Sequence, residues 1–181
     1  VLAMRRTLFV VPVGDLDVVE RSSTVAVAAN ERKRLLGFLA DSDVGDPAGW
    51  LDEAFGEVAA ALEDEGGLPA RTITSKVPRL ATKIVMGAGT KNSATAGATS
   101  RVLAVMANEG KLMRGRPAGL WTGRQYTWHL RSSWLRDEPA TASLDEALSS
   151  TQLPSTEVPS TEVASTELVR RWLQTFGPGT F

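Results

Sequence analysis

The stretch that decides the fold reads TSRVLAVMANEG over residues 99–110 and KLMRGRPAGLWTGRQYTW over residues 111–128. Its first half predicts a helix, because Thr99 or Ser100 can cap the first turn and Gly110 can end the last one. The apolar residues that would face a core share helical spacing: Val102, Leu103, Val105 and Met106.

The second half of this stretch predicts a β-hairpin. Two short extended runs, 111–115 and 120–128, flank the turn sequence Arg-Pro-Ala-Gly at 116–119. Proline and glycine suit a tight turn, and glycine lets the backbone approach a neighbour closely. A third helix followed by a hairpin is the second half of a winged helix. In that fold the third helix enters the major groove, and the hairpin, or wing, follows the backbone or the minor groove.

Upstream segments supply the other helices that a winged helix needs. A helix is predicted from Trp50 to Gly66, and a short one from Pro69 to about Val77. Residues 87–97 are rich in Gly, Ala, Ser and Thr and predict a mobile loop. The predictions nearer the N-terminus are a strand over 4–13, a helix from Asp15 to about Ala29, and a second helix over 31–40 capped by Asn30.

These elements predict a mainly helical α+β fold, a winged helix-turn-helix with a β-hairpin wing and flanking helices. We expect residues 1–47 to be a strand and helices from a preceding winged-helix unit, and 48–136 to be the winged-helix DNA-binding domain. Residues 137–164 predict an acidic low-complexity linker, because four copies of a five-residue unit overlap them and a period of five matches neither helix nor strand. Residues 165–181 then begin a following helical unit, so we expect a segment of a longer protein.

Charge is segregated along the chain. Residues 71–136 hold twelve basic residues and one acid, Glu109, a net charge of +11, whereas the rest holds eight bases and twenty acids. A positive field over one surface attracts phosphates even when the total charge is near zero. The plainer interpretation is a solvated face against which acids from 41–65 and 137–167 fold back.

The composition limits the kinds of site. The chain has no cysteine and one histidine, His129, so it predicts no disulfide, no thiolate site and no histidine metal cluster. No apolar run is long enough to span a membrane, and no signal peptide is recognisable. We therefore expect a monomeric cytoplasmic protein at the nucleoid, with no cofactor, metal or membrane partner.

Double-stranded DNA is the partner that the basic segment predicts. The helix candidate is Arg101, near the start of the third helix, where it can reach a base or a phosphate; its alternative is an ordinary exposed arginine. The other candidates are phosphate contacts: Lys111, Arg114, Arg116 and Arg124 on the hairpin, Lys91 in the small-residue loop, and Arg71 and Lys76 on the short helix.

Several other residues admit a functional and a structural interpretation. Gly87 to Lys91 superficially resembles a phosphate-cradling loop but lacks the Walker A spacing, which argues against nucleotide binding. Trp121, Tyr126 and Trp128 can stack on an unpaired base, but we expect them to pack in the core of the wing instead. For His129 we expect a structural role.

Several blocks together resemble one family: MRRTLFVVP at 4–12, SRVL at 100–103 with EGK at 109–111, RGRPAGLWTGRQYTW at 114–128, and LVRRWL at 168–173 with FGPGT at 176–180. They are similar to actinobacterial winged-helix proteins of the AlkZ/YcaQ type. The resemblance covers most of the chain except the repeats. It implies tandem winged helices and a DNA glycosylase that acts on alkylated or crosslinked DNA.

The resemblance carries no catalytic residue onto this chain. The family's Gln-x-Gln or Gln-x-Asp motif lies upstream of the block at 4–12, and no glutamine here stands in that pattern. The enzyme assignment therefore stays open. One hypothesis is the DNA-binding portion of a glycosylase-like repair protein. The alternatives are a non-catalytic transcriptional or architectural winged-helix protein and a degraded gene fragment.

Overall fold

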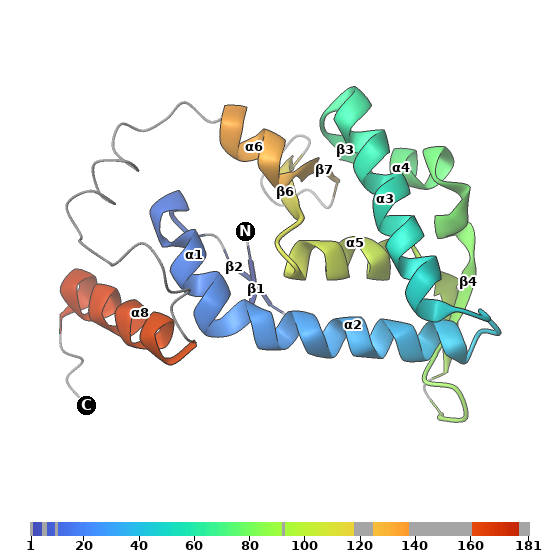
Figure 1. Ribbon diagram of the computed structural model, residues 1–181, viewed down its shortest axis with the longest axis horizontal. Coiled ribbons are helices and arrows are strands. Elements are labelled where there is room, and N and C mark those ends of the chain that lie inside the picture. The colour runs from blue at the N-terminus through green and yellow to red at the C-terminus, as the bar shows by residue number, and fades with distance from the viewer. Residues whose placement is uncertain are drawn as a thin grey trace. The chain divides into compact units, whose positions relative to one another are not determined.

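The computed structural model describes residues 2–4, 7–9, 11–91, 93–117, 125–137 and 161–177. The chain divides into two compact units, which we call the terminal unit (Val1–Val27 with Leu135–Phe181) and the central unit (Ala28–Trp134). Helices dominate, and the strands form small antiparallel sheets (Figure 1). The prediction of a mainly helical α+β fold is confirmed.

The central unit contains most of the regular structure. Its helices are α2 (Val25–Ala40), α3 (Pro47–Glu65), α4 (Ala70–Lys76), the 3-10 turn η3 (Pro78–Ala81), α5 (Thr99–Asn108) and α6 (Arg131–Asp137). Its strands are β3 (Leu68–Pro69), β4 (Lys83–Met86), β5 (Ala94–Gly97), β6 (Leu112–Pro117) and β7 (Tyr126–Leu130).

Two sheets hold these strands. The first has the order β3-β7-β6, all antiparallel, and pairs Leu68 with Trp128 and Leu112 with Leu130. The second is the hairpin β4–β5, inserted between α4 and α5, in which Lys83 lies opposite Gly97. Apart from the inserted hairpin, the elements follow the order α3, β3, α4, α5 and the β6–β7 hairpin, and β3 lies beside β7. This order is compatible with a winged helix.

The core of the central unit explains why these helices form. Asp46 accepts a hydrogen bond from the Gly49 N–H at 3.0 Å and caps α3, whose proline at the first position suits a helix start. The buried side chains of α3 then recur at helical spacing and meet those of α5 and the sheet. This core includes Leu51, Ala54, Val58, Leu62, Ile73, Val102, Leu103, Met106 and Leu112.

Gly110 ends α5 as predicted. Its φ of 71° lies in the left-handed region, where glycine carries no Cβ penalty. Two hydrogen bonds close the turn, from the Gly110 N–H to the Ala107 carbonyl at 3.1 Å and from the Lys111 N–H to the Met106 carbonyl at 2.9 Å. This closure places the start of β6 directly after α5.

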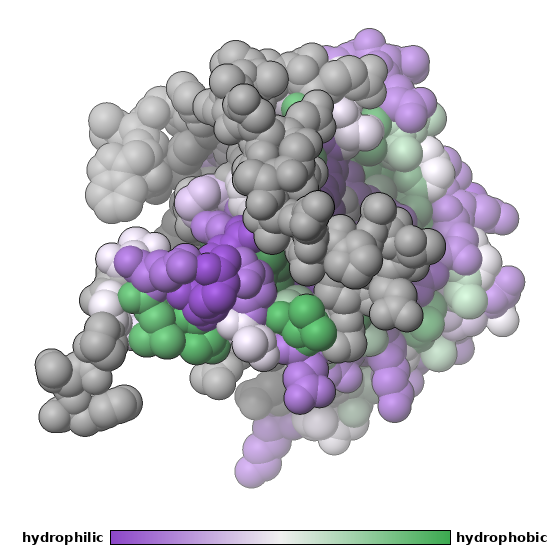
Figure 2. Space-filling model, turned by 60° about the vertical axis from the view of Figure 1, so that its left-hand side comes forward, coloured by the Kyte–Doolittle hydropathy of each residue, from purple (hydrophilic) through white to green (hydrophobic). Residues whose placement is uncertain are grey.

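The terminal unit is smaller. It contains β1 (Leu2–Met4), β2 (Thr7–Phe9), the 3-10 turn η1 (Val13–Asp15), α1 (Leu16–Val19), the π-helical segment η2 (Glu20–Thr24) and α8 (Thr161–Phe176). Leu16 and Val19 form its described core with Val11, Leu135 and Leu168. On the face that carries α8, apolar side chains lie beside strongly hydrophilic ones (Figure 2). The exposed apolar side chains of α8 include Val169, Trp172 and Leu173.

Two predictions near the N-terminal end need correction. The single strand over 4–13 is two short strands paired with each other, β1 and β2, and residues 13–15 form a 3-10 turn. Asn30 caps no helix, because α2 continues through it to Ala40. Asn30 is exposed there, so its poor helix propensity costs only a few tenths of a kcal/mol.

Corrections also apply to the segments around α5. Residues 94–97 are strand β5 instead of loop, although their small side chains carry no strand signal. No side chain caps α5, whose N-cap residue is Ala98. The Thr99 hydroxyl instead donates to the Leu80 carbonyl at 3.2 Å and lies 2.8 Å from the Thr74 hydroxyl, which joins α5 to α4.

The remaining boundaries shift by a few residues. Pro69 belongs to β3 and precedes α4, and β6 continues through Arg116 and Pro117, which were predicted to form the turn. The rest of that turn, Ala118 and Gly119, lies outside the described residues, as do 120–124 of the predicted second run and most of the predicted linker. Helix α8 begins at Thr161, inside the third repeat, and therefore earlier than predicted.

Candidate nucleic-acid interface

The eight basic residues from Arg71 to Arg114 fall into two sets. The paired cations, each with a carboxylate partner, are Lys76, Arg79 and Lys111. The unpaired cations have no carboxylate within ion-pair distance among the described residues, and they are Arg71, Lys83, Lys91, Arg101 and Arg114. The separation of basic from acidic residues along the sequence is therefore only partly kept in the folded protein.

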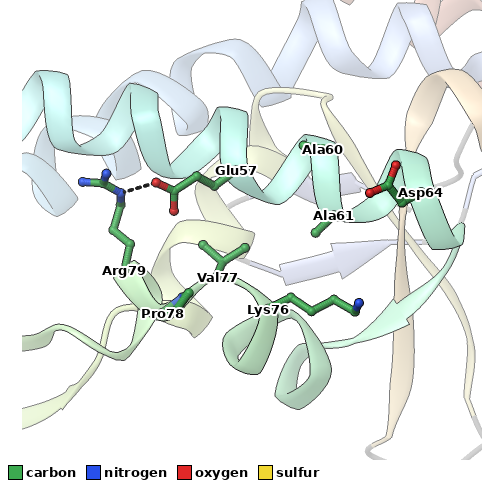
Figure 3. Close-up of a pocket in the computed structure, with 8 residues that line it drawn as sticks. All are labelled: Glu57, Ala60, Ala61, Asp64, Lys76, Val77, Pro78 and Arg79. Atoms are coloured by element: carbon green, nitrogen blue, oxygen red, sulfur yellow. Dashed lines mark hydrogen bonds and ion pairs between the residues drawn. The ribbon is translucent and has the colours of Figure 1, made fainter.

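Acids of α3 neutralise the first two paired cations. The Arg79 guanidinium lies 2.9 Å from Glu57 Oε1 and 2.7 Å from Glu53 Oε2 (Figure 3 shows the bond to Glu57). Lys76 forms an ion pair with Glu65, near the end of the same helix. The acids that close these pairs come from outside the basic segment, so counting its own charges could not find them.

A groove of about 670 Å³ runs between α3 and the segment from α4 to η3 (Figure 3). Its lining consists of Glu57, Ala60, Ala61, Asp64, Lys76, Val77, Pro78 and Arg79. The lining contains no aromatic ring on which an extruded base could stack. Acidic and basic groups alternate along it, so it does not present the one-signed field that a polyanion needs.

The third paired cation belongs to a network around Glu109. Glu109 lies 2.6 Å from Lys111 Nζ and 3.0 Å from Arg32 Nη1, and Arg32 also reaches Asp52 at 2.5 Å. Burial opposes the charge of Arg32, but its hydrogen bonds to Asp52 and Glu109 raise its pKa above the ordinary value. The Arg32 guanidinium carbon and Lys111 Nζ each lie 5.4 Å from the centroid of the Phe55 ring. This network ties α2, α3 and the start of the wing together.

The unpaired cations occupy the start of α4, the inserted hairpin, the start of α5 and the wing. Arg71 is exposed in the first turn of α4, and Arg101 is half-buried in the first turn of α5. Lys83 is exposed at the base of the β4–β5 hairpin, opposite Gly97, which directly precedes the residues that start α5. Lys91 is exposed in the turn that joins β4 to β5. The hydroxyl contact between α4 and α5 keeps the first turn of α5 beside α4.

Arg114 is the unpaired cation of the wing. Its guanidinium carbon lies 3.3 Å from the centroid of the Tyr126 ring and 5.7 Å from that of Trp128. The two rings meet edge to face, with centroids 5.4 Å apart. A cation over an aromatic face is attracted by the ring without losing its charge.

The predicted DNA-contacting residues differ in their surroundings. Arg71, Lys91, Arg101 and Arg114 keep unpaired charges in the described part of the chain. Lys76 and Lys111 have carboxylate partners. The side chain of Arg116 and all of Arg124 lie outside what the structure describes.

Helix α5 has one basic residue, Arg101, and its exposed positions include Ser100 and Ala104. Sequence reasoning also missed one cation of this surface. Lys83 was counted in the basic segment but not chosen as a contact, because its strand was not recognised. Its position became apparent only from the pairing of β4 with β5.

The described aromatic and histidine residues of the wing pack against neighbouring side chains. Trp128 is 6% exposed and belongs to the central core, and Tyr126 packs against that core. His129 Nε2 lies 2.8 Å from the Thr127 hydroxyl, and its ring meets Trp134 edge to face at 4.5 Å. Trp121 lies outside the described residues.

Neither a metal site nor a membrane helix was found where the structure can be examined. Within the described ranges, no group of three His, Asp or Glu side chains is arranged to hold a metal ion. None of the helices in that part of the chain is both long and apolar enough to cross a bilayer.

Comparison with known proteins gives one match. A family model described as "DNA glycosylase AlkZ-like" matches residues 1–181. Neither the curated proteins nor the solved structures gave a match. The match spans both units, and it agrees with the resemblance drawn from the sequence blocks.

Proposed function

The chain belongs to the AlkZ-like DNA glycosylase family, and on this premise we propose that its central unit binds double-stranded DNA through a winged helix. The protein would act as part of a DNA-repair glycosylase on alkylated or crosslinked DNA. We further propose 48–136 as the DNA-binding domain, following a unit that includes 1–47 and followed by a linker from 137 and by a helical unit that begins with α8 at Thr161.

The observation that carries the proposal is the set of unpaired cations. Arg71, Lys83, Lys91, Arg101 and Arg114 have no carboxylate partner in the described part of the chain. Like charges on neighbouring elements repel one another, and a polyanion relieves that repulsion. Each cation that meets a phosphate also releases a condensed counterion from DNA, which favours binding at low salt.

The element order supports a specific docking. The first turn of α5, with Arg101, would enter the major groove, and Arg114 on the wing would reach the backbone or the minor groove. Arg71, at the start of α4, and Lys83 and Lys91, on the inserted hairpin, would then contact phosphates on either side of the groove. Arg116 and Arg124 remain candidates from the sequence alone.

We assign no catalytic residue to this chain. Excision of a base needs a group that positions water beside an extruded nucleoside. The family motif for that task is absent from these residues, and Glu57, one of the two carboxylates that line the groove, is engaged by Arg79. The function proposed for the central unit is therefore binding.

The test is a fluorescence anisotropy titration of the whole chain with a labelled 25-base-pair duplex at 50 mM and 200 mM salt. Five phosphate contacts predict a log–log slope of about −4.5, a loss of several hundredfold in affinity over that range. Absence of binding at 50 mM salt, or equal affinity at both concentrations, would overturn the proposal.

A further inference from the structure

In the wing, the Arg114 side chain contacts the ring of Tyr126 directly. We infer that Tyr126 is a positioning residue, which holds the Arg114 guanidinium in the orientation in which the wing meets a DNA phosphate. This inference rests on the proposed function and adds to it how the wing presents its charge. Its basis is the placement of Arg114 over a ring that is itself immobilised.

The guanidinium lies in direct contact with the ring face. A separation of 3.3 Å between the guanidinium carbon and the Tyr126 centroid is a van der Waals contact. An arginine stacked in this way covers one face of its plane and keeps its N–H donors, which point outward within that plane. Those donors match two oxygens of one phosphate, so the stack leaves the phosphate-binding edge unused.

Contacts with the core and with Trp128 hold the Tyr126 ring in place. Tyr126 packs against the core of the central unit and meets Trp128 edge to face at an interplanar angle of 67°. Trp128 is buried and lies directly opposite Arg114 in the β6–β7 pairing. The guanidinium therefore rests on a rigid surface, which lowers the entropy lost when it binds an anion.

The strand pairing is irregular directly after Arg114. Arg114 pairs with Trp128 and Pro117 with Tyr126, so three steps along β6 match two along β7, a β-bulge with one extra residue. Gly115 lies within this bulge. A Cβ at Gly115 would lie 2.6 Å from Thr127 Oγ1 and 2.7 Å from His129 Nε2, so a larger residue there would force those side chains to move.

A purely structural contact is the competing explanation. In that case Arg114 shields Tyr126 from water, and the stack contributes only to stability. The two explanations differ in what Tyr126 does when Arg114 is absent. A positioning role makes the effect of Tyr126 on DNA affinity depend on Arg114, whereas a structural role does not.

The experiment is a double-mutant cycle on the whole chain, using Tyr126→Leu, Arg114→Ala and the combined variant. Kd for a 25-base-pair duplex is measured at 100 mM salt, and Tm is measured for each variant. We expect Tyr126→Leu to weaken binding about five- to tenfold, the range of a partly desolvated cation–π contact. In the Arg114→Ala background the same change should weaken binding less than twofold. Tyr126→Phe, which keeps the ring, should bind within twofold of the unaltered protein.

A second variant keeps the inference testable if Tyr126→Leu fails to fold. Arg114→Lys keeps the charge but loses the planar fork, and we expect it to bind about fivefold more weakly with Tm almost unchanged. Equal affinity of Arg114→Lys and the unaltered protein, or equal effects of Tyr126→Leu in both backgrounds, would overturn the positioning role while duplex binding stands. If the unaltered protein does not bind duplex DNA at all, the proposed function itself fails.

Discussion

The cations that pair with acids of α3 and the unpaired cations come from the same basic segment but differ in their surroundings. Lys76 and Arg79 meet Glu65, Glu53 and Glu57, whereas Arg101 and Arg114 meet no carboxylate among the described residues. The plainer interpretation of the sequence, in which acids from 41–65 fold back, therefore holds for one part of the segment and not for the other. The comparison teaches that net charge along a segment does not define a binding surface, because acids from elsewhere decide which cations remain available.

The largest effect should come from reversing two unpaired cations. At 0.1 M salt, counterion release makes each phosphate contact worth nearly tenfold in affinity, and a glutamate adds repulsion. The double variant Arg101→Glu with Arg114→Glu should therefore bind duplex DNA at least about 60-fold more weakly. Anisotropy measures the loss, and circular dichroism checks that the fold is retained. A loss of less than fivefold in a folded variant would mean that this surface does not meet DNA.

A matched pair of lysines sharpens the comparison. Lys91 and Lys111 are both exposed, but Lys111 has Glu109 as a partner and Lys91 has no carboxylate among the described residues. Lys91→Ala should weaken binding about eightfold at 0.1 M salt, and Lys111→Ala less than twofold. Competition titrations against one labelled duplex give both values. If Lys111→Ala proves the more damaging, the division into paired and unpaired cations has no predictive value.

On the side of the paired cations, substitution should change stability and leave binding unchanged. Arg79→Ala removes two ion pairs and a guanidinium that lies 5.9 Å from the Trp50 centroid. The pairs are partly exposed, so the free energy of unfolding should fall by about 1 kcal/mol. Urea unfolding measures the fall. Affinity for DNA should stay within twofold. A large loss of affinity without a loss of stability would mean that Arg79 contacts DNA, as proposed for the unpaired cations.

The smallest effect concerns ion pairs in the terminal unit. Hydrogen bonds from Arg170 and Arg171 lower the pKa of Glu167 from its ordinary 4.5 to about 2. Because the folded-state pKa is depressed, this pairing stabilises the protein above about pH 4.5 and is lost as the pH falls toward 2. The free energies of unfolding of the unaltered protein and Glu167→Gln should therefore differ above pH 5 and converge near pH 2. A difference that does not depend on pH would contradict this account.

The sequence predicted those elements whose signals are local. The helical spacing from Trp50 to Leu62 predicted α3, and Gly110 predicted the end of α5, because apolar periodicity and a left-handed glycine do not depend on distant residues. Strand β5 was missed because Ala94 to Gly97 have small side chains and pair only with β4. The cap at Thr99 was wrong because its hydroxyl bonds to Leu80 and Thr74.

Prediction of the interface was limited for the same reason. The sequence identified Arg101 and Arg114 from their place on the third helix and the hairpin. It could not show that Lys76 meets Glu65 or that Arg32 reaches Glu109, because these pairs join elements distant in the chain. Nor could it show the stack of Arg114 on Tyr126, which joins β6 to β7.

Salt dependence tests the division between the two sets most directly. The log–log slope of duplex affinity against salt is measured for the unaltered protein, for Lys83→Ala and for Lys76→Ala. One phosphate contact contributes about 0.9 to the slope. The account predicts about −4.5 for the unaltered protein, about −3.6 for Lys83→Ala and no change for Lys76→Ala. A slope that flattens for Lys76→Ala and stays the same for Lys83→Ala would contradict it.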